Sequence, residues 1–144
     1  MTIAIDIQRL IPQVCRAHHA LAQVLFGELG LYRGQPAVLE LLWEQDGRTH
    51  TELGEALRVQ PATVTKMMQR MEQAGFLERR PDPDDQRVSR VYLTPRAWEV
   101  RPAVMRIVET LAEVTMQDFT LEEQALLRRF LVQMRDNLRR VSME

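Results

Sequence analysis

Apolar residues recur at steps of three and four near the beginning of the chain. The repeating positions are Ile7, Leu10, Ile11, Val14, His18, Leu21, Ala22, Leu25 and Phe26. This spacing places them on one face of a helix, so the pattern predicts an amphipathic helix over about 4–27. Pro12 lies inside the pattern, and the helix therefore either kinks there or begins near it.

Three shorter helical patterns follow, each with its own start signal. Pro36 fits the first turn of a helix with an apolar stripe that ends at Trp43. Residues 49–52 read Thr-His-Thr-Glu, a capping box in which the Thr and Glu side chains bond to free backbone N–H groups. Pro61 fits the first turn of a third helix, which ends near Ala74, just before a glycine.

The pattern changes from helical to alternating after this point. Residues 76–80 are short enough for a strand, 81–87 form a polar turn, and 88–93 alternate between apolar and polar positions. Together these segments predict a β-hairpin with a seven-residue tip.

Two long helical patterns complete the chain. The first covers about 95–117 and starts with Thr-Pro. The second follows a capping box at 120–123 and has apolar positions at alternating steps of four and three, which is heptad spacing. These positions are Leu127, Leu131, Met134, Leu138 and Val141. The sequence therefore predicts a mainly α fold with a small β-hairpin.

Length and composition limit the class of protein. The chain has 144 residues, of which 45% are hydrophobic and 27% charged, as expected for one globular domain. Its single cysteine excludes an internal disulfide framework and a CxxC zinc ribbon. No apolar run is long enough to span a membrane. The first residues do not have the pattern of a secretory signal, so we expect a cytoplasmic protein without a membrane partner.

Charge is distributed unevenly along the chain. The net charge is −1, so no overall field attracts nucleic acid. Residues 48–96, however, contain nine basic and seven acidic side chains and have a net charge of +2. Local charge therefore favours this segment as a site for an anionic partner.

Residues 50–68 have the spacing of a helix-turn-helix. Their apolar positions are Leu53, Leu57, Val59, Val64 and Met67. We expect the two leucines to share one face of the first helix, and Val64 and Met67 to face inward from the second. Gly54 allows the two helices to approach closely. A plain pair of antiparallel helices is the alternative.

The remaining face of the second helix is suited to DNA. It carries Gln60, Ala62, Thr63, Thr65, Lys66, Gln69 and Arg70. A helix in the major groove needs donors for base edges and phosphates, and no carboxylate near its leading end. No acid precedes Glu72 on this face, whereas an ordinary solvated face, the alternative, usually mixes both signs of charge.

The hairpin supplies a second set of basic side chains. They are Arg79, Arg80, Arg87 and Arg90. Three aspartates near the tip are expected to build the turn by bonding to its backbone, and a nearby carboxylate would hold Arg87 extended toward a minor groove. The alternative is that Arg87 only neutralises these acids.

These motifs resemble the MarR-type winged-helix transcriptional regulators. The resemblance covers essentially the whole chain, 1–144, as a single domain, and its most specific part is Asp85-Gln-Arg87 followed by Leu-Thr. It implies a winged helix-turn-helix lobe over about 34–96, flanked by dimerisation helices over about 4–27 and 95–142. By match of motif, Arg87 would enter the minor groove, Asp85 would orient it, and 62–70 would lie in the major groove.

The resemblance further implies a homodimer that binds a palindrome on double-stranded DNA. The apolar surface of the first and last helices, which exceeds what a small lobe needs, independently favours a dimer, because two half-sites increase specificity. We expect a repressor released by a small organic effector or an oxidant. A winged-helix module that binds protein without specific DNA recognition is the alternative.

Cys15 is a candidate redox sensor, because some MarR-type regulators sense peroxides through a cysteine in the first helix. The supporting tyrosines of that branch are replaced here by Arg33 and Pro36, which favours Cys15 as a small residue on the buried stripe. His18 and His19 could share a metal with Cys15, but they form only half a site, so we predict no metal and no cofactor. No hydrolase, metalloprotease, P-loop or dinucleotide motif occurs, which argues against an enzyme.

Overall fold

A computed structural model describes residues 2–143. The chain forms two compact units, with the boundary between Glu109 and Thr110. The first unit contains α1, a small sheet with three helices, and most of α5. The second contains the end of α5 and all of α6. Among the described residues, no helix combines the length and the apolar character that a membrane crossing requires.

Helix α1 spans Ile3–Gly27 and begins well before Pro12, which lies inside it. The side chain of Thr2 caps its first turn by accepting a hydrogen bond from the Ile5 N–H. No residue of α1 is buried in the single chain. The predicted apolar stripe is present. Its first half is mostly exposed, at Leu10 and Val14 for example, and its last residues from Leu21 to Phe26 are half-buried.

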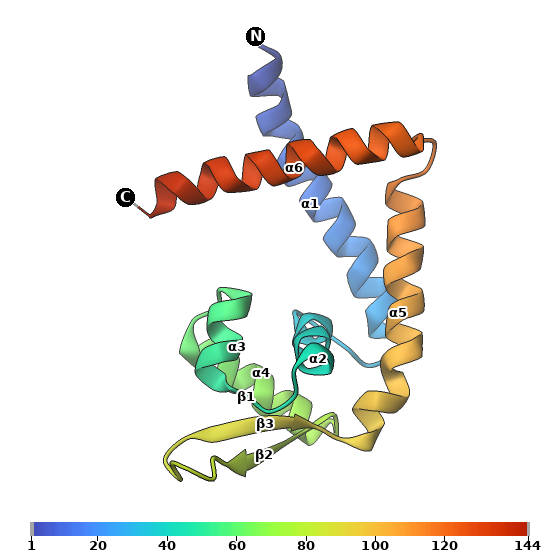
Figure 1. The fold of residues 1–144 in the computed structure, drawn as a ribbon. Coiled ribbons are helices and arrows are strands. Elements are labelled where there is room, and N and C mark those ends of the chain that lie inside the picture. Colours follow the sequence, from blue (N-terminus) through green and yellow to red (C-terminus); the bar gives the residue numbers. More distant parts are fainter. Residues whose placement is uncertain (1, 144) are drawn as a thin grey trace. The chain divides into compact units, whose positions relative to one another are not determined.

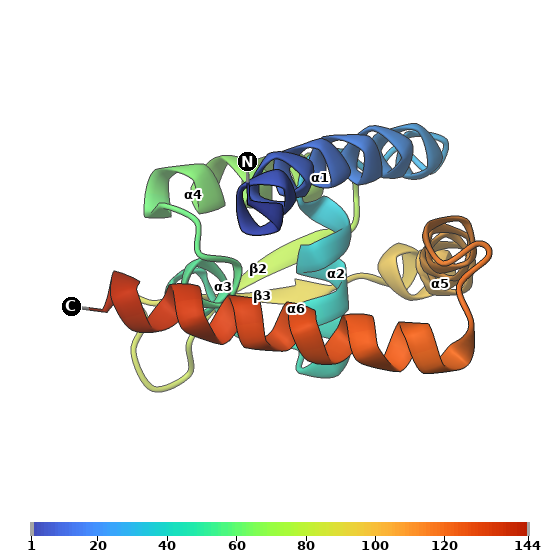
Figure 2. The same cartoon turned by 90° about the horizontal axis from the view of Figure 1, so that it is seen from above.

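The sheet and three short helices form the lobe that the sequence predicts. The order along the chain is α2 (Gln35–Glu44), β1 (Arg48–Thr49), α3 (His50–Leu57), α4 (Pro61–Gln73), β2 (Leu77–Pro81) and β3 (Ser89–Leu93). The strands are antiparallel in the order β1-β3-β2. Figures 1 and 2 both place α2 over one face of this sheet.

Strand β1 is absent from the sequence prediction. Arg48 and Thr49 pair with Val91 and Arg90, so β3 becomes the middle strand of the sheet. Two residues are too few to show an alternating pattern. The same threonine caps α3, because its side chain accepts a hydrogen bond from the Glu52 N–H at 3.1 Å.

One apolar core holds the lobe together. Its largest fully buried side chains are Phe76, Leu31, Leu39, Leu42, Leu53, Met68, Met71, Val38, Val64, Val91 and Val104. They come from α2, α3, α4, β3 and α5, from the loop before α2, and from the position just before β2. The loop before α2, helices α2–α4 and the hairpin are therefore fixed to one another by apolar burial.

The last two helices are long. Helix α5 spans Pro95–Thr115 and ends slightly before the predicted boundary, and α6 spans Leu121–Ser142. The capping box at the start of α6 is formed as predicted: the Glu123 N–H donates to Thr120 Oγ1, and the Thr120 N–H donates to Glu123 Oε2. No residue of α6 is buried in the single chain.

Candidate nucleic-acid interface

Helices α3 and α4 pack at close range around Gly54. A Cβ atom added to Gly54 would lie 3.2 Å from the Val59 carbonyl oxygen and 3.2 Å from Val64 Cγ2. Leu53 and Val64 are completely buried beside it. The predicted helix-turn-helix packing is therefore confirmed, and a larger residue at 54 would require its neighbours to move.

The inward face of α4 differs in part from the prediction. Val64 faces the core as expected, but the deeply buried methionines are Met68 and Met71, and Met67 is only partly buried. The prediction for Met67 is confirmed, since it packs against the core, but Met68 and Met71, which were not predicted to face inward, are buried more deeply. Met67 and Met68 are consecutive and Met71 follows three residues later, so spacing alone did not rank the three by depth of burial.

The other faces of α4 carry the side chains predicted to contact DNA. Six of the seven, Gln60, Ala62, Thr63, Lys66, Gln69 and Arg70, are exposed, and Thr65 is half-buried. The Thr65 hydroxyl donates to the Pro61 carbonyl at 3.1 Å within the helix. The face has no carboxylate before Glu72, so its leading half presents neutral polar groups, small groups and positive charge, with no negative charge.

The wing tip is built by aspartate side chains. The buried Asp82 accepts hydrogen bonds at Oδ1 from the backbone N–H groups of Asp84 (2.7 Å) and Asp85 (3.1 Å). Asp85 accepts from the backbone N–H and from Nε of Arg87, both at 3.1 Å. The side chain of Arg87 remains 90% exposed. Asp85 therefore contacts Arg87 while leaving its guanidinium open to a partner.

The other hairpin arginines have partners inside the lobe. Arg79 Nε donates to Glu72 of α4 at 2.9 Å, and Arg80 pairs with Glu78 and stacks on Tyr92. Arg90 Nε donates to Asp82 at 2.6 Å. That hydrogen bond from Arg90 is the main reason that the pKa of Asp82 is lowered, and the turn amides lower it further.

His50 is an unexpected feature of the first turn of α3. Its Nε2 atom is buried and has no hydrogen-bond partner among residues 2–143. Burial lowers the pKa of His50, the positive charge of Arg79 lowers it further, and Glu72 acts in the opposite direction. The sequence does not predict this, because nothing in the spacing around His50 indicates that its side chain is buried.

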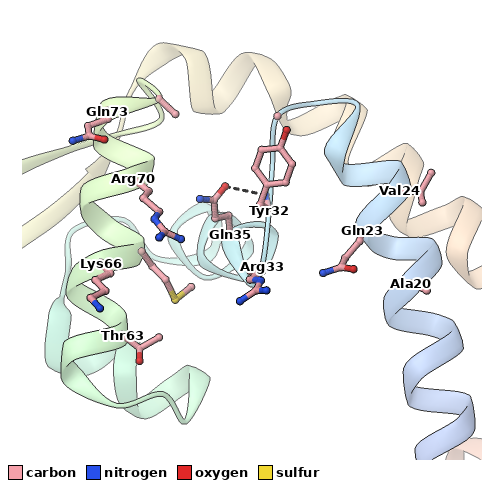
Figure 3. Close-up of a pocket in the computed structure, with 13 residues that line it drawn as sticks. Ala20, Gln23, Val24, Tyr32, Arg33, Gln35, Thr63, Lys66, Arg70 and Gln73 are labelled. Atoms are coloured by element: carbon pink, nitrogen blue, oxygen red, sulfur yellow. Dashed lines mark hydrogen bonds between the residues drawn. The ribbon is translucent and has the colours of Figure 1, made fainter.

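A large open pocket of about 1050 Å³ lies between α1, the loop before α2, and α4. Its basic lining residues are Arg33, Lys66 and Arg70. Figure 3 shows Arg70 extending from α4 toward the segment that carries Arg33 and Gln35. Gln35 is buried and accepts a hydrogen bond from the Tyr32 N–H at 3.0 Å, which stabilises this wall. The pocket is not predictable from the sequence, because its walls are distant from one another in the chain.

Cys15 lies on α1 with an exposed side chain. The expectation that it belongs to a buried stripe was therefore wrong for the single chain, since α1 has no buried residue. His18 and His19 are also exposed. Within residues 2–143, no three His, Cys, Asp or Glu side chains lie close enough to hold a metal ion.

Helix α4 is the second helix of a helix-turn-helix, and a β-hairpin with an exposed arginine at its tip follows it. Together these features define a winged helix-turn-helix protein. Comparison with known proteins gives the family. Residues 31–89 match the model of the MarR family. The transcriptional regulator AdcR of Streptococcus pneumoniae is 32% identical, over 90% of this chain and 92% of its own length. The chain belongs to the MarR family of helix-turn-helix transcriptional regulators.

Solved structures agree with this assignment. The transcriptional regulator SlyA is 30% identical, with a TM-score of 0.83 over 92% of this chain and 94% of its own. A mutant MarR from Escherichia coli, complexed with operator DNA, is 26% identical, with a TM-score of 0.83 over 91% of this chain and 94% of its own.

Proposed function

We propose that this protein regulates transcription by binding double-stranded DNA at specific sequences, with α4 in the major groove. The observation that carries the proposal is the exposed, carboxylate-free leading face of α4, rigidly held on a buried core. Its side chains offer hydrogen-bond donors to bases and phosphates, with Lys66 and Arg70 providing positive charge. The relative solved with operator DNA supports the same use of the fold.

The wing supplies the second contact in this proposal. Arg87 enters the adjacent minor groove in this proposal, which is supported by its side chain being more exposed than those of Arg79, Arg80 and Arg90. Asp85 orients it through the two hydrogen bonds at 3.1 Å. Arg79 is partly exposed beside Glu72. We propose that it contacts a phosphate at the base of the wing.

The whole chain acts in this proposal as one MarR-type domain that forms a homodimer. The helices over about 4–27 and 95–142 form the dimer contact, and the lobe over about 34–96 binds DNA. Exposed apolar side chains on both terminal helices support this, for example Val14 (58%) on α1 and Leu138 (66%) on α6. Covering such surface stabilises an assembly by the hydrophobic effect.

A small organic effector is proposed to bind the pocket between α1 and α4. Three residues of the α4 DNA face, Thr63, Lys66 and Arg70, also line that pocket. An anionic effector would therefore draw on the same positive charge that DNA uses, and would weaken DNA binding. Oxidation of the exposed Cys15 thiol is the alternative signal, and peroxide treatment of wild type and Cys15→Ser separates the two.

Selection from a pool of random double-stranded DNA tests the proposal. The purified chain should enrich one sequence family with two related half-sites about 10 base pairs apart. Enrichment of no sequence over an input control, after several rounds at moderate salt, would contradict specific DNA recognition. It would favour a lobe that binds a protein partner.

A further inference from the structure

Arg90 lies in the middle strand of the sheet and is held by acceptors from two parts of the lobe. Its Nε donates to Asp82 Oδ2 at 2.6 Å, and its Nη1 donates to the Gly47 carbonyl at 2.8 Å. Its side chain is 32% exposed, whereas that of Arg87 is 90% exposed. Two of the directions in which a guanidinium donates are therefore already used.

Asp82 connects Arg90 to the backbone of the wing tip. One carboxylate oxygen accepts from Arg90, and the other accepts from the N–H groups of Asp84 and Asp85. The Asp82 N–H also donates to the Val88 carbonyl at 2.8 Å, across the base of the tip. This buried carboxylate therefore fixes the conformation of the tip.

A continuous series of bonds joins the wing tip to the helix-turn-helix. It starts at Gly47, which directly precedes β1 and α3, and passes through Arg90 and Asp82 to Asp85. Asp85 then binds Arg87. The position of the Arg87 guanidinium relative to α3 thus depends on the hydrogen bonds of Asp82 and Arg90.

We propose that Asp82 and Arg90 are positioning residues for DNA recognition. They set the wing tip, and with it Arg87, at a fixed place relative to α3 and α4, and they do not touch DNA themselves. The inference rests on the proposed DNA binding. It assigns Arg90 a role other than the direct contact that the sequence predicts.

A positioning role and a purely electrostatic role of Asp82 predict opposite changes in DNA affinity for one substitution. Asp82→Asn removes a negative charge from a lobe that binds phosphate, so simple electrostatics predicts equal or tighter binding. The positioning role predicts weaker binding, because an asparagine cannot accept from Arg90 with one oxygen and from both turn amides with a second oxygen. Asp84→Asn is the matched control, since it makes the same charge change at an exposed position of the same turn.

The experiment measures the dissociation constant for the selected DNA at several salt concentrations. We expect Asp82→Asn and Arg90→Lys to weaken binding about three- to tenfold. Arg90→Lys keeps the charge but loses the two-sided guanidinium, so the salt dependence should change less than it does for Arg87→Ala. Asp84→Asn should bind as tightly as wild type or more tightly.

The double variant of Arg87→Ala with Arg90→Lys separates positioning from direct contact. Residues that act through Arg87 lose their effect once it is gone, so the double variant should bind no more weakly than Arg87→Ala alone. Additive losses, or tighter binding by Asp82→Asn, would overturn the inference.

Two controls keep the result interpretable. Thermal unfolding verifies that each variant is folded at the assay temperature. If Asp82→Asn is not folded there, the affinity of Arg90→Lys alone tests the inference. Failure of the wild type to bind the selected DNA would instead contradict the proposed function, and it would be seen before any variant is compared.

Discussion

At the scale of single residues, the wing shows which contacts follow from local sequence and which depend on residues distant in the chain. The aspartates of the tip were predicted to bond to the turn backbone, and Asp82 and Asp85 do so. The sequence did not show that the Arg90 side chain is held by hydrogen bonds to Asp82 and Gly47. One of its acceptors, Gly47, lies 43 residues away in the chain, where strand alternation carries no information.

Replacing Arg87 with alanine should weaken binding to all DNA sequences, by about tenfold for the loss of one close contact. The slope of log affinity against log salt should fall by about one unit, because one fewer counterion is released. Electrophoretic or anisotropy titrations at several salt concentrations provide the measurement.

Arg80→Ala is the matched control for this change. It removes the same charge from the same hairpin, but Arg80 is held by Glu78 and the Tyr92 ring, whose centroid lies 4.5 Å away. We expect a smaller loss of affinity. Equal losses for the two variants would show that only the total charge of the hairpin matters.

His50 should make the stability of the lobe depend on pH. Its pKa is lowered in the folded chain from about 6.5, chiefly by burial, so protonation favours the unfolded chain. Neutral His50 makes its full contribution to the free energy of unfolding above the pKa that it has in the unfolded chain. That contribution is lost as pH falls through the lower pKa that it has in the folded chain. The free energy of unfolding should therefore drop on acidification in this window, and drop less in His50→Gln. Parallel pH curves for the two proteins, measured by urea unfolding, would contradict this.

At the scale of elements, every helix and both long strands were predictable, the helices from their apolar spacing and the strands from short segments on either side of a polar turn. The capping boxes before α3 and α6 are formed as the sequence indicates. Strand β1 was missed because its pairing with β3 depends on tertiary contact. The precise inward residues of α4 were also uncertain from spacing, since Met67, Met68 and Met71 differ only in their packing.

The turn between α2 and β1 should not tolerate a side chain at Gly47. This residue has φ of +73°, and an added Cβ would lie 2.9 Å from the Tyr92 ring. Gly30 has the same φ of +73° with nothing within 4 Å of the added atom, so it is a matched control for backbone strain alone. We expect Gly30→Ala to lower the free energy of unfolding by about 1 kcal/mol, and Gly47→Ala to lower it further. Equal values from chemical denaturation would exclude a role for the ring.

At the scale of the whole molecule, the sequence indicated more apolar surface than one lobe can cover, and the single chain leaves that surface exposed. Ile3 on α1 and Val141 on α6 are 79% and 74% exposed. Cys15 was assigned to a buried stripe because helical periodicity identifies an apolar face but not what covers it.

The proposed homodimer predicts the effect of a charge on α6. Leu138→Glu places a carboxylate in the predicted heptad seam, so it should shift the protein toward monomer and weaken operator binding at least tenfold. Light scattering coupled to size exclusion measures the mass, and Arg135→Glu, at an exposed polar position of the same helix, is the control. A dimer that persists unchanged in Leu138→Glu would place the interface elsewhere.

The central claim, that the winged lobe reads DNA sequence, is tested most directly by titrating the wild-type chain with its selected site and with a scrambled site of equal composition. The titrations are made at about 50 and 200 mM salt, a range over which nonspecific binding weakens strongly. We predict that the selected site keeps a clear preference at the higher salt. Equal, weak binding of both sites that disappears at the higher salt would contradict the claim.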